Sequence, residues 1–342
     1  MEPAEPEHAN ESRRRALTRA LRIALAFAIS GGAVALLAGQ VDWPRAYGAM
    51  RAANLTWIAV AIAWSLVIVW GRGARWAFLQ PGPGLGIHTA AIAVQTFYNR
   101  IAPMRLGELT LPFLLRRYAG QDASRTLLLL IVVRIVELAV LIGLLALATL
   151  CRTGTAHRGW LVGMVVLLAA MTLLLAKFRL VTRLGLAVAA RLARWTRVER
   201  APQIGRAFAR LEEAIQGESQ LSRRQRMGLV AWTAILQLMQ VASIDAILRA
   251  FGVDLDWLAL TQGTAVALAG PALPLPSVGM VGTLEASWTI GFAWVGVPTE
   301  TAILTGIATQ VVTLLFAAVV ALPGWWYLLT RAAERTRRSN KS

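Results

Sequence analysis

Long stretches without a charged side chain constrain the fold of this chain more than any other feature. About 20 apolar residues in an α-helix cross a hydrocarbon core of roughly 30 Å. The stretch Leu127–Leu150 meets this length and contains only two charged residues, Arg134 and Glu137. Five further stretches carry no charge: Ile23–Val41, Leu55–Gly71, Trp160–Ala176, Met227–Ile244 and Thr301–Leu322. The sequence therefore predicts an all-α, polytopic integral membrane protein with six full transmembrane helices.

The first of these stretches, Ile23–Val41, has a second interpretation. It follows a basic segment and has small residues at Ala38 and Gly39, which also describes a cleaved signal peptide. The apolar core of a signal peptide spans about 7 to 15 residues, and this run has nineteen. The length favours a membrane anchor.

Charge and apolar content have to be considered together. The chain has 35 Lys and Arg against 18 Asp and Glu, a net charge of +17. In a soluble protein such an excess would suggest nucleic acid as a partner. Here 57% of residues are hydrophobic and 15% are charged, against about 25% charged in soluble domains. An apolar and basic chain fits a membrane protein with cytoplasmic arginines, so nucleic acid is not expected as a partner.

The sequence contains no familiar catalytic or metal-binding pattern. Cys151 is the only cysteine, so no intrachain disulfide and no CxxC motif can form. His8, His88 and His157 lack the spacing of metal ligands. We find no GxSxG, HExxH or phosphate-binding P-loop pattern. No cofactor and no metal is therefore expected. An enzyme is not excluded, but no catalytic motif in the sequence supports one.

Two further segments, Gly86–Tyr118 and Trp257–Val297, are apolar at both ends and interrupted in the middle. Each arm has about 12 to 15 residues and would reach roughly 18 to 22 Å as a helix, too short to span a membrane. Each segment is therefore one kinked span or a re-entrant hairpin of two half-helices. The prolines and glycines at the predicted tips are Pro103 and Gly107 in the first, and Pro274, Pro276, Gly279 and Gly282 in the second.

The distribution of basic residues favours re-entrant hairpins. From Lys177 to Arg226 there are twelve Lys or Arg against four Glu, which predicts a cytoplasmic loop. A first hairpin that enters and leaves on the cytoplasmic side keeps this loop inside together with Arg72 and Arg75. A second hairpin that opens outward returns the C-terminal tail to the cytoplasm. Both termini are then cytoplasmic.

This topology gives one membrane domain, residues 23–327, between cytoplasmic tails at 1–22 and 328–342. The hairpins occupy residues 86–118 and 257–297. Apolar residues in the loop 177–226 have helical spacing and alternate with an arginine-rich face. Such a loop is typical of a helix lying on an anionic leaflet. A solvated helical hairpin that packs on itself is the alternative.

The topology also contains an inverted repeat, because a full span, a hairpin and a full span occur twice. Both tips have proline, then glycine, then a glutamate at the start of the second half-helix, Glu108 in one and Glu285 in the other. Many secondary transporters use inverted repeats with broken helices to build a site that is reachable from both sides. Simple kinks in ordinary spans are the alternative, and they would leave the basic loop outside.

Charged residues at membrane depth are the candidate substrate-binding residues, since each costs roughly 2.5 to more than 10 kcal/mol there. Arg100 and Arg105 flank the first tip, and Glu108 follows it. Arginines beside a half-helix N-terminus suit a phosphate. Arg134 and Glu137 lie three residues apart on one helix face. The alternatives are an intrahelical ion pair for Arg134 and Glu137, and a helix cap for Glu108.

Glu285 has no basic residue near it in its own hairpin. An unpaired carboxyl group at that depth could carry a proton, or it could pair with an arginine from the first hairpin. Weaker polar candidates lie in the flanking spans, and for the glutamines hydrogen bonding between helices is the favoured role. These candidates are Gln237, Gln240, Asp245, Arg249 and Gln310.

The motif Pro103-Met-Arg105-Leu-Gly107-Glu108, followed by Arg134-Ile-Val-Glu137, resembles a signature of the lysylphosphatidylglycerol synthase transmembrane-region family, the flippase-like integral membrane proteins. The stretch from Pro276 to Ala286 is similar to a later proline- and glycine-rich motif of that family, and the match covers about residues 23–327. Val133 departs from the family's acidic residue, and Val278 and Met280 replace its proline and glycine.

The resemblance implies a lipid flippase or transporter that moves a phospholipid or a polyprenyl- or hopanoid-pathway lipid across a bacterial inner membrane. Membrane lipids with anionic head groups are the expected partners. Lysyl transfer is not expected, since about fifteen residues follow Tyr327. An intramembrane transferase with Glu108 or Glu285 as base, or an accessory subunit of a lipid-biosynthesis enzyme, is the alternative. A second copy of the chain as partner is left open.

Overall fold

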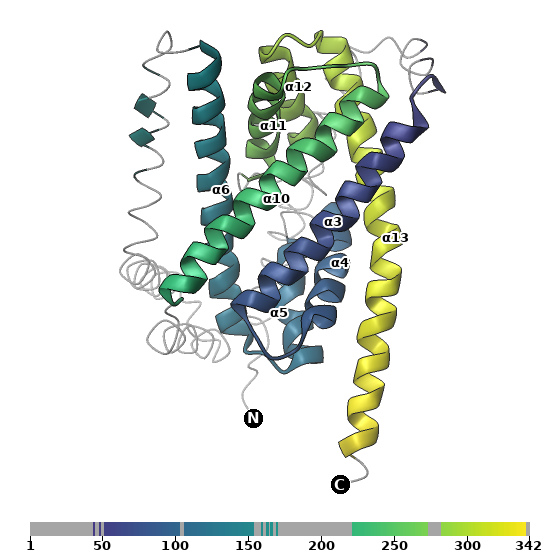
Figure 1. Ribbon diagram of the computed structural model, residues 1–342. Coiled ribbons are helices and arrows are strands. Elements are labelled where there is room, and N and C mark those ends of the chain that lie inside the picture. The colour runs from purple at the N-terminus through teal and green to yellow at the C-terminus, as the bar shows by residue number, and fades with distance from the viewer. Residues whose placement is uncertain are drawn as a thin grey trace, which may run out of the picture.

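A computed structural model describes residues 51–102, 106–153, 221–272 and 282–339, with a few isolated residues near 44–48 and 159–169. The regular structure of these described residues is helical throughout (Figure 1). Its elements are α3 (Leu55–Leu79), α4 (Leu85–Ile101), the 3-10 turn η1 (Leu106–Leu109), α5 (Thr110–Leu114), the π-helical turn η2 (Leu115–Ala119), α6 (Ala123–Thr153), α10 (Arg223–Ala250), α11 (Trp257–Ala272), α12 (Thr283–Trp294) and α13 (Thr299–Ser339).

Four of these helices, α3, α6, α10 and α13, are long and apolar enough to cross a membrane. They correspond to four of the six predicted spans. The other two predictions, Ile23–Val41 and nearly all of Trp160–Ala176, lie outside the described residues. For the described residues, the structure confirms the predicted helical character and several helices that could cross a membrane.

Helix α3 is longer than predicted and ends at Leu79 rather than at Gly71. Its start is capped by Asn54, whose side chain accepts a hydrogen bond from the Thr56 N–H at 2.9 Å. It ends just before Pro81 and two glycines with positive φ, where a helix cannot continue. The extension brings Arg75 inside the bundle, with 3% of its surface exposed. Counting Arg75 as a charge that marks the cytoplasmic surface was therefore wrong.

The first interrupted segment (α4, η1, α5 and η2) folds back on itself. Gly107 lies directly against α4, because a Cβ there would be 2.5 Å from the backbone of Tyr98 and Asn99. The segment ends at Gly120, which adopts the left-handed conformation with φ of 70°. Its predicted tip, residues 103–105, lies outside the described residues, and with it Pro103 and Arg105.

The second interrupted segment (α11 and α12) is a closely packed antiparallel pair. A Cβ on Gly270 would lie 2.4 Å from the Ser287 side chain, and one on Gly291 would lie 2.6 Å from the Gly263 carbonyl oxygen. Small residues at such spacing let helix backbones approach each other. Residues 273–281 lie outside the described residues, including Pro274, Pro276 and Gly279. The two interrupted segments lie toward opposite ends of the bundle (Figure 1).

The described helices form two halves, α3 to α6 and α10 to α13, and each interrupted segment packs against a long helix of the other half. Helix α3 packs on α10, α4 packs on α13, and α11 packs on α6. In the α4–α13 contact, a Cβ on Gly324 would lie 2.9 Å from the Ala90 carbonyl oxygen. In the α6–α11 contact, Gln262 accepts from the Arg152 guanidinium at 2.9 Å and donates to Thr149 Oγ1 at 3.1 Å. Each interrupted segment thus lies against the last long helix of the other half.

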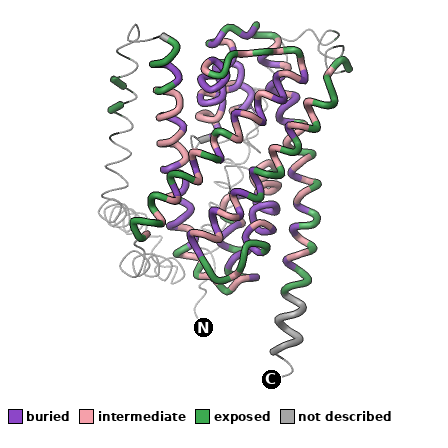
Figure 2. The backbone as a smooth tube through the Cα atoms, in the orientation of Figure 1, coloured by how far each residue is buried: buried purple, intermediate pink, exposed green. Residues whose placement is uncertain are grey.

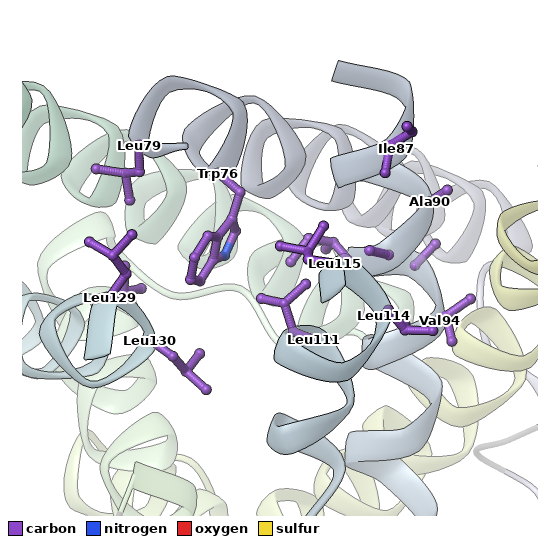
Figure 3. Close-up of a cluster of buried hydrophobic side chains, with 14 of the residues drawn as sticks. Trp76, Leu79, Ile87, Ala90, Val94, Leu111, Leu114, Leu115, Leu129 and Leu130 are labelled. Atoms are coloured by element: carbon purple, nitrogen blue, oxygen red, sulfur yellow. The ribbon is translucent and has the colours of Figure 1, made fainter. Parts of the chain in front are cut away.

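The largest apolar core lies where the first interrupted segment meets α3 and α6 (Figure 3). Trp76, Leu111, Leu114 and Leu115 are all fully buried there. The exposed positions of the long helices lie on their outer faces (Figure 2). Large apolar side chains such as Leu315 and Val319 remain exposed on α13, as expected for a surface that faces lipid.

Candidate functional site

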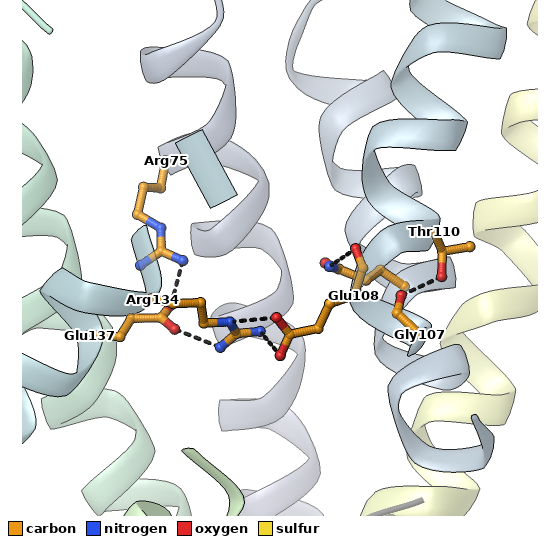
Figure 4. Close-up of polar contacts among 7 residues, drawn as sticks. Arg75, Gly107, Glu108, Thr110, Arg134 and Glu137 are labelled. Carbon is orange, nitrogen blue, oxygen red and sulfur yellow. Dashed lines mark hydrogen bonds and ion pairs between the residues drawn. The ribbon is translucent and has the colours of Figure 1, made fainter. Parts of the chain in front are cut away.

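Four charged side chains form a continuous ladder between α3, α6 and the first interrupted segment (Figure 4). Arg75 Nη2 lies 2.6 Å from Glu137 Oε1, and Glu137 Oε2 lies 2.6 Å from Arg134 Nη1. The opposite edge of the Arg134 guanidinium faces Glu108, with Nη2 at 3.1 Å from Oε1 and Nε at 3.2 Å from Oε2. Arginine and glutamate alternate along the ladder, so each interior charge lies between two opposite charges.

Helix geometry explains the α6 part of the ladder. Arg134 and Glu137 are three residues apart, so they share one face of α6. Arg134 is eleven residues after Ala123, roughly 16 Å along the helix and about a third of the way through it. The intrahelical ion pair, given above as the alternative for these two residues, is present, and it belongs to a larger network.

Arg75 fixes the inner end of this ladder. Besides Glu137, it donates through Nη1 to Thr233 Oγ1 of α10 at 3.1 Å. A single side chain thus joins three long helices, α3, α6 and α10. Sequence reasoning missed Arg75 and Thr233 as members of the site. The apolar residues Trp76–Leu79 that follow Arg75 were the available signal that the helix continues beyond it.

Glu108 reaches across from η1 to α6. Its main chain is held on α4, since Gln95 Nε2 donates to the Glu108 carbonyl oxygen at 3.2 Å. Thr110 Oγ1 donates to the carbonyl oxygen of Gly107. Glu108 lies in the first turn of η1, where the sequence alternative placed it, and both of its carboxylate oxygens face Arg134.

Arg100 lies at the end of α4 and has its own set of partners. Its Nη1 donates to Gln310 Oε1 of α13 at 2.8 Å. It also interacts electrostatically with Glu285 of the second interrupted segment. Gln310, a weaker candidate from the sequence, therefore forms an interhelical hydrogen bond as predicted for the glutamines. Arg100 connects the two halves of the bundle.

Glu285 is buried, with 4% of its surface exposed, and it is directed toward its own helix. It accepts a hydrogen bond from the Gly282 N–H at 2.7 Å, which satisfies the first turn of α12. Gly282 adopts a φ of 84°, a conformation that favours glycine. The sequence left two alternatives for this carboxyl group, a proton carrier and a partner for an arginine of the first segment. Its interaction with Arg100 agrees with the alternative of a partner from the first segment.

The remaining charged candidates lie elsewhere. Arg249 pairs with Asp245 at 2.8 Å and with Asp254 at 2.9 Å near the end of α10, and it lies over the Trp57 ring. These groups belong to a separate, more exposed cluster. In the described ranges, no group of three His, Cys, Asp or Glu side chains could hold a metal ion. The chemistry that the ladder offers is the binding of an anion by guanidinium groups.

Comparison with known proteins assigns the family. No match is found among curated proteins, and none is found among solved structures. The family model described as "Lysylphosphatidylglycerol synthase TM region" matches residues 23–321, which contain every member of the ladder. This match agrees with the resemblance seen in the sequence motifs. The chain therefore belongs to the lysylphosphatidylglycerol synthase transmembrane-region family.

Proposed function

We propose that this protein moves a lipid with a phosphate-containing head group between the leaflets of a bacterial inner membrane. The observation that carries the proposal is the ladder of Arg75, Glu137, Arg134 and Glu108 within apolar helices. Charges at membrane depth are costly, and proteins keep them there for substrate or ion pathways. Guanidinium groups bind phosphate through paired hydrogen bonds.

The arrangement of helices supports a transporter. We propose six full spans and two re-entrant hairpins, inserted from opposite sides as an inverted repeat. The exchanged packing of α4 on α13 and of α11 on α6 is the pattern that two related halves would produce. In such proteins the broken helices meet near the midplane, where a site opens alternately to either side.

The residue roles follow from this arrangement. Arg100, Arg105 and Arg134 would bind the phosphate, while Glu108, Glu137 and Glu285 balance their charge. The tip residues Pro103, Gly107, Pro274, Pro276, Gly279 and Gly282 would let the hairpins turn. In the proposed topology both termini and the loop 177–226 face the cytoplasm, and this loop lies on the anionic leaflet.

The test is translocation of fluorescent phosphatidylglycerol, or of a fluorescent polyprenyl phosphate, in liposomes that contain the purified protein. We expect faster translocation than in empty liposomes and a large loss in Arg105→Ala. Arg224→Gln serves as the control, because Arg224 is exposed in the first turn of α10. Wild-type translocation no faster than that of Arg105→Ala would contradict the proposal. A new covalent lipid species in mass spectra would favour the transferase instead.

A further inference from the structure

Arg134 has two carboxylate partners, Glu137 on its own helix and Glu108 on the first interrupted segment. We infer that the Glu108 carboxylate occupies the position in which Arg134 binds the phosphate of the lipid, and that the phosphate displaces it. The inference rests on the proposed function. It adds that Glu108 occupies the phosphate position before the lipid binds. Glu108 is then an internal substitute for the ligand.

Glu137 is the permanent partner of Arg134. It lies on the same helix at 2.6 Å, and its second oxygen is held by Arg75, also at 2.6 Å. The Arg75 side chain is 3% exposed and bonded to Thr233 as well. Releasing Glu137 would leave a buried guanidinium without its partner, which costs several kcal/mol. This part of the ladder is therefore rigid.

Glu108 is the exchangeable partner. It comes from a different segment, and its contacts with Arg134 are longer, at 3.1 and 3.2 Å. The Arg134 side chain is also 37% exposed, so a ligand can reach it. The Glu108 main chain is fixed on α4 by Gln95. Rotation of the side chain alone can therefore uncover the guanidinium without unfolding the segment.

The geometry of the contact suits a phosphate. Glu108 presents two oxygens to the Nε and Nη2 edge of Arg134. Two oxygens of a phosphate can face that edge in the same manner. After the exchange the same guanidinium edge would again face two oxygens.

The net charge of the four ladder side chains also favours a phosphate as the ligand. Arg75 and Arg134 contribute two positive charges, and Glu137 and Glu108 contribute two negative charges, so the ladder is neutral as it stands. With Glu108 turned away, the other three side chains carry a single positive charge. A phosphodiester, with one negative charge, replaces the charge that Glu108 supplied. The predicted ligand group is thus a lipid phosphate, and a net cationic head group would be disfavoured.

The experiment measures binding by the purified full-length protein in zwitterionic detergent, titrated with short-chain phosphatidylglycerol and, separately, with inorganic phosphate. We expect Glu108→Gln to bind phosphatidylglycerol about tenfold more tightly than the wild type, since one competing charge is gone. Glu108→Asp keeps the charge but shortens the side chain, so we expect an intermediate increase. Glu300→Gln, in the exposed first turn of α13, should bind like the wild type.

The possible outcomes separate the two claims. Tighter binding of phosphatidylglycerol alone supports the inference with a lipid as the source of the phosphate. Tighter binding of inorganic phosphate as well supports a position that recognises the phosphate group itself. Unchanged or weaker binding by both variants, with wild-type thermal stability, would overturn the inference. If the wild type still translocates lipid in that case, the proposed function stands, and if it does not, both fail.

Discussion

The two interrupted segments start from the same pattern of proline, glycine and glutamate and arrive at different arrangements. In the first, Glu108 extends away from its segment and pairs with Arg134 of α6. In the second, Glu285 is directed back to its own backbone at Gly282. The shared motif therefore places a carboxylate at the same position in each segment. The residues that surround it determine which partner the carboxylate binds. Only the first segment has an arginine opposite its glutamate at ion-pair distance among the described residues.

The two segments also differ in the regularity of their second arms. Gly263, Gly270 and Gly291 bring α11 and α12 into backbone contact. The second arm of the first segment is instead divided into a 3-10 turn, a short helix and a π-helical turn. Such irregular turns are frequent at functional sites. Both segments thus contain close glycine contacts, and the first has in addition an irregular second arm that presents Glu108 to α6.

Removing the charge at the centre of the ladder should have the largest effect. Glu137→Leu leaves Arg75 and Arg134 without their shared partner, and we expect a loss of about 3 to 5 kcal/mol in the free energy of unfolding. Thermal unfolding in detergent measures it, with Glu300→Leu as the control. A loss below that of Glu285→Gln would mean that the first segment does not depend on its charges.

Adding a side chain at the close contact between α11 and α12 should have the next largest effect. Gly291→Val places side-chain atoms where the Gly263 carbonyl oxygen and Val266 lie, and we expect a loss of about 1 to 3 kcal/mol. Gly143→Ala is the matched control, because nothing lies within 4 Å of a Cβ at that position of α6. Equal thermal stability of the two variants would show that the second segment does not rely on close packing.

Glu285→Gln should have the smallest effect. The amide oxygen can still accept from the Gly282 N–H, and only the electrostatic interaction with Arg100 is lost, so we expect a loss of about 1 kcal/mol. Translocation should fall less than in Glu108→Gln, since Glu285 does not contact Arg134. A greater loss of translocation in Glu285→Gln would place the principal site in the second segment and reverse the comparison.

Sequence reasoning predicted the elements better than their contacts. Apolar length is a local property, so four of the spans and both interruptions could be located from it. The ion pair of Arg75 with Glu137 joins residues 62 positions apart and depends on how α3 packs against α6. Likewise, the sequence placed Glu285 at a half-helix start, but its inward hydrogen bond depends on the backbone conformation of Gly282. Periodicity does not carry such information.

The proposed transport depends on the ladder at the first interrupted segment, which would bind the lipid phosphate. Two arginines provide a matched test, because Arg134 and Arg249 each pair with a carboxylate on their own helix. Translocation of fluorescent phosphatidylglycerol should fall about 100-fold in Arg134→Gln, which corresponds to the loss of roughly 3 kcal/mol of phosphate binding. In Arg249→Gln it should stay near the wild-type rate. Equal rates in the two variants would contradict a role of the ladder in phosphate binding.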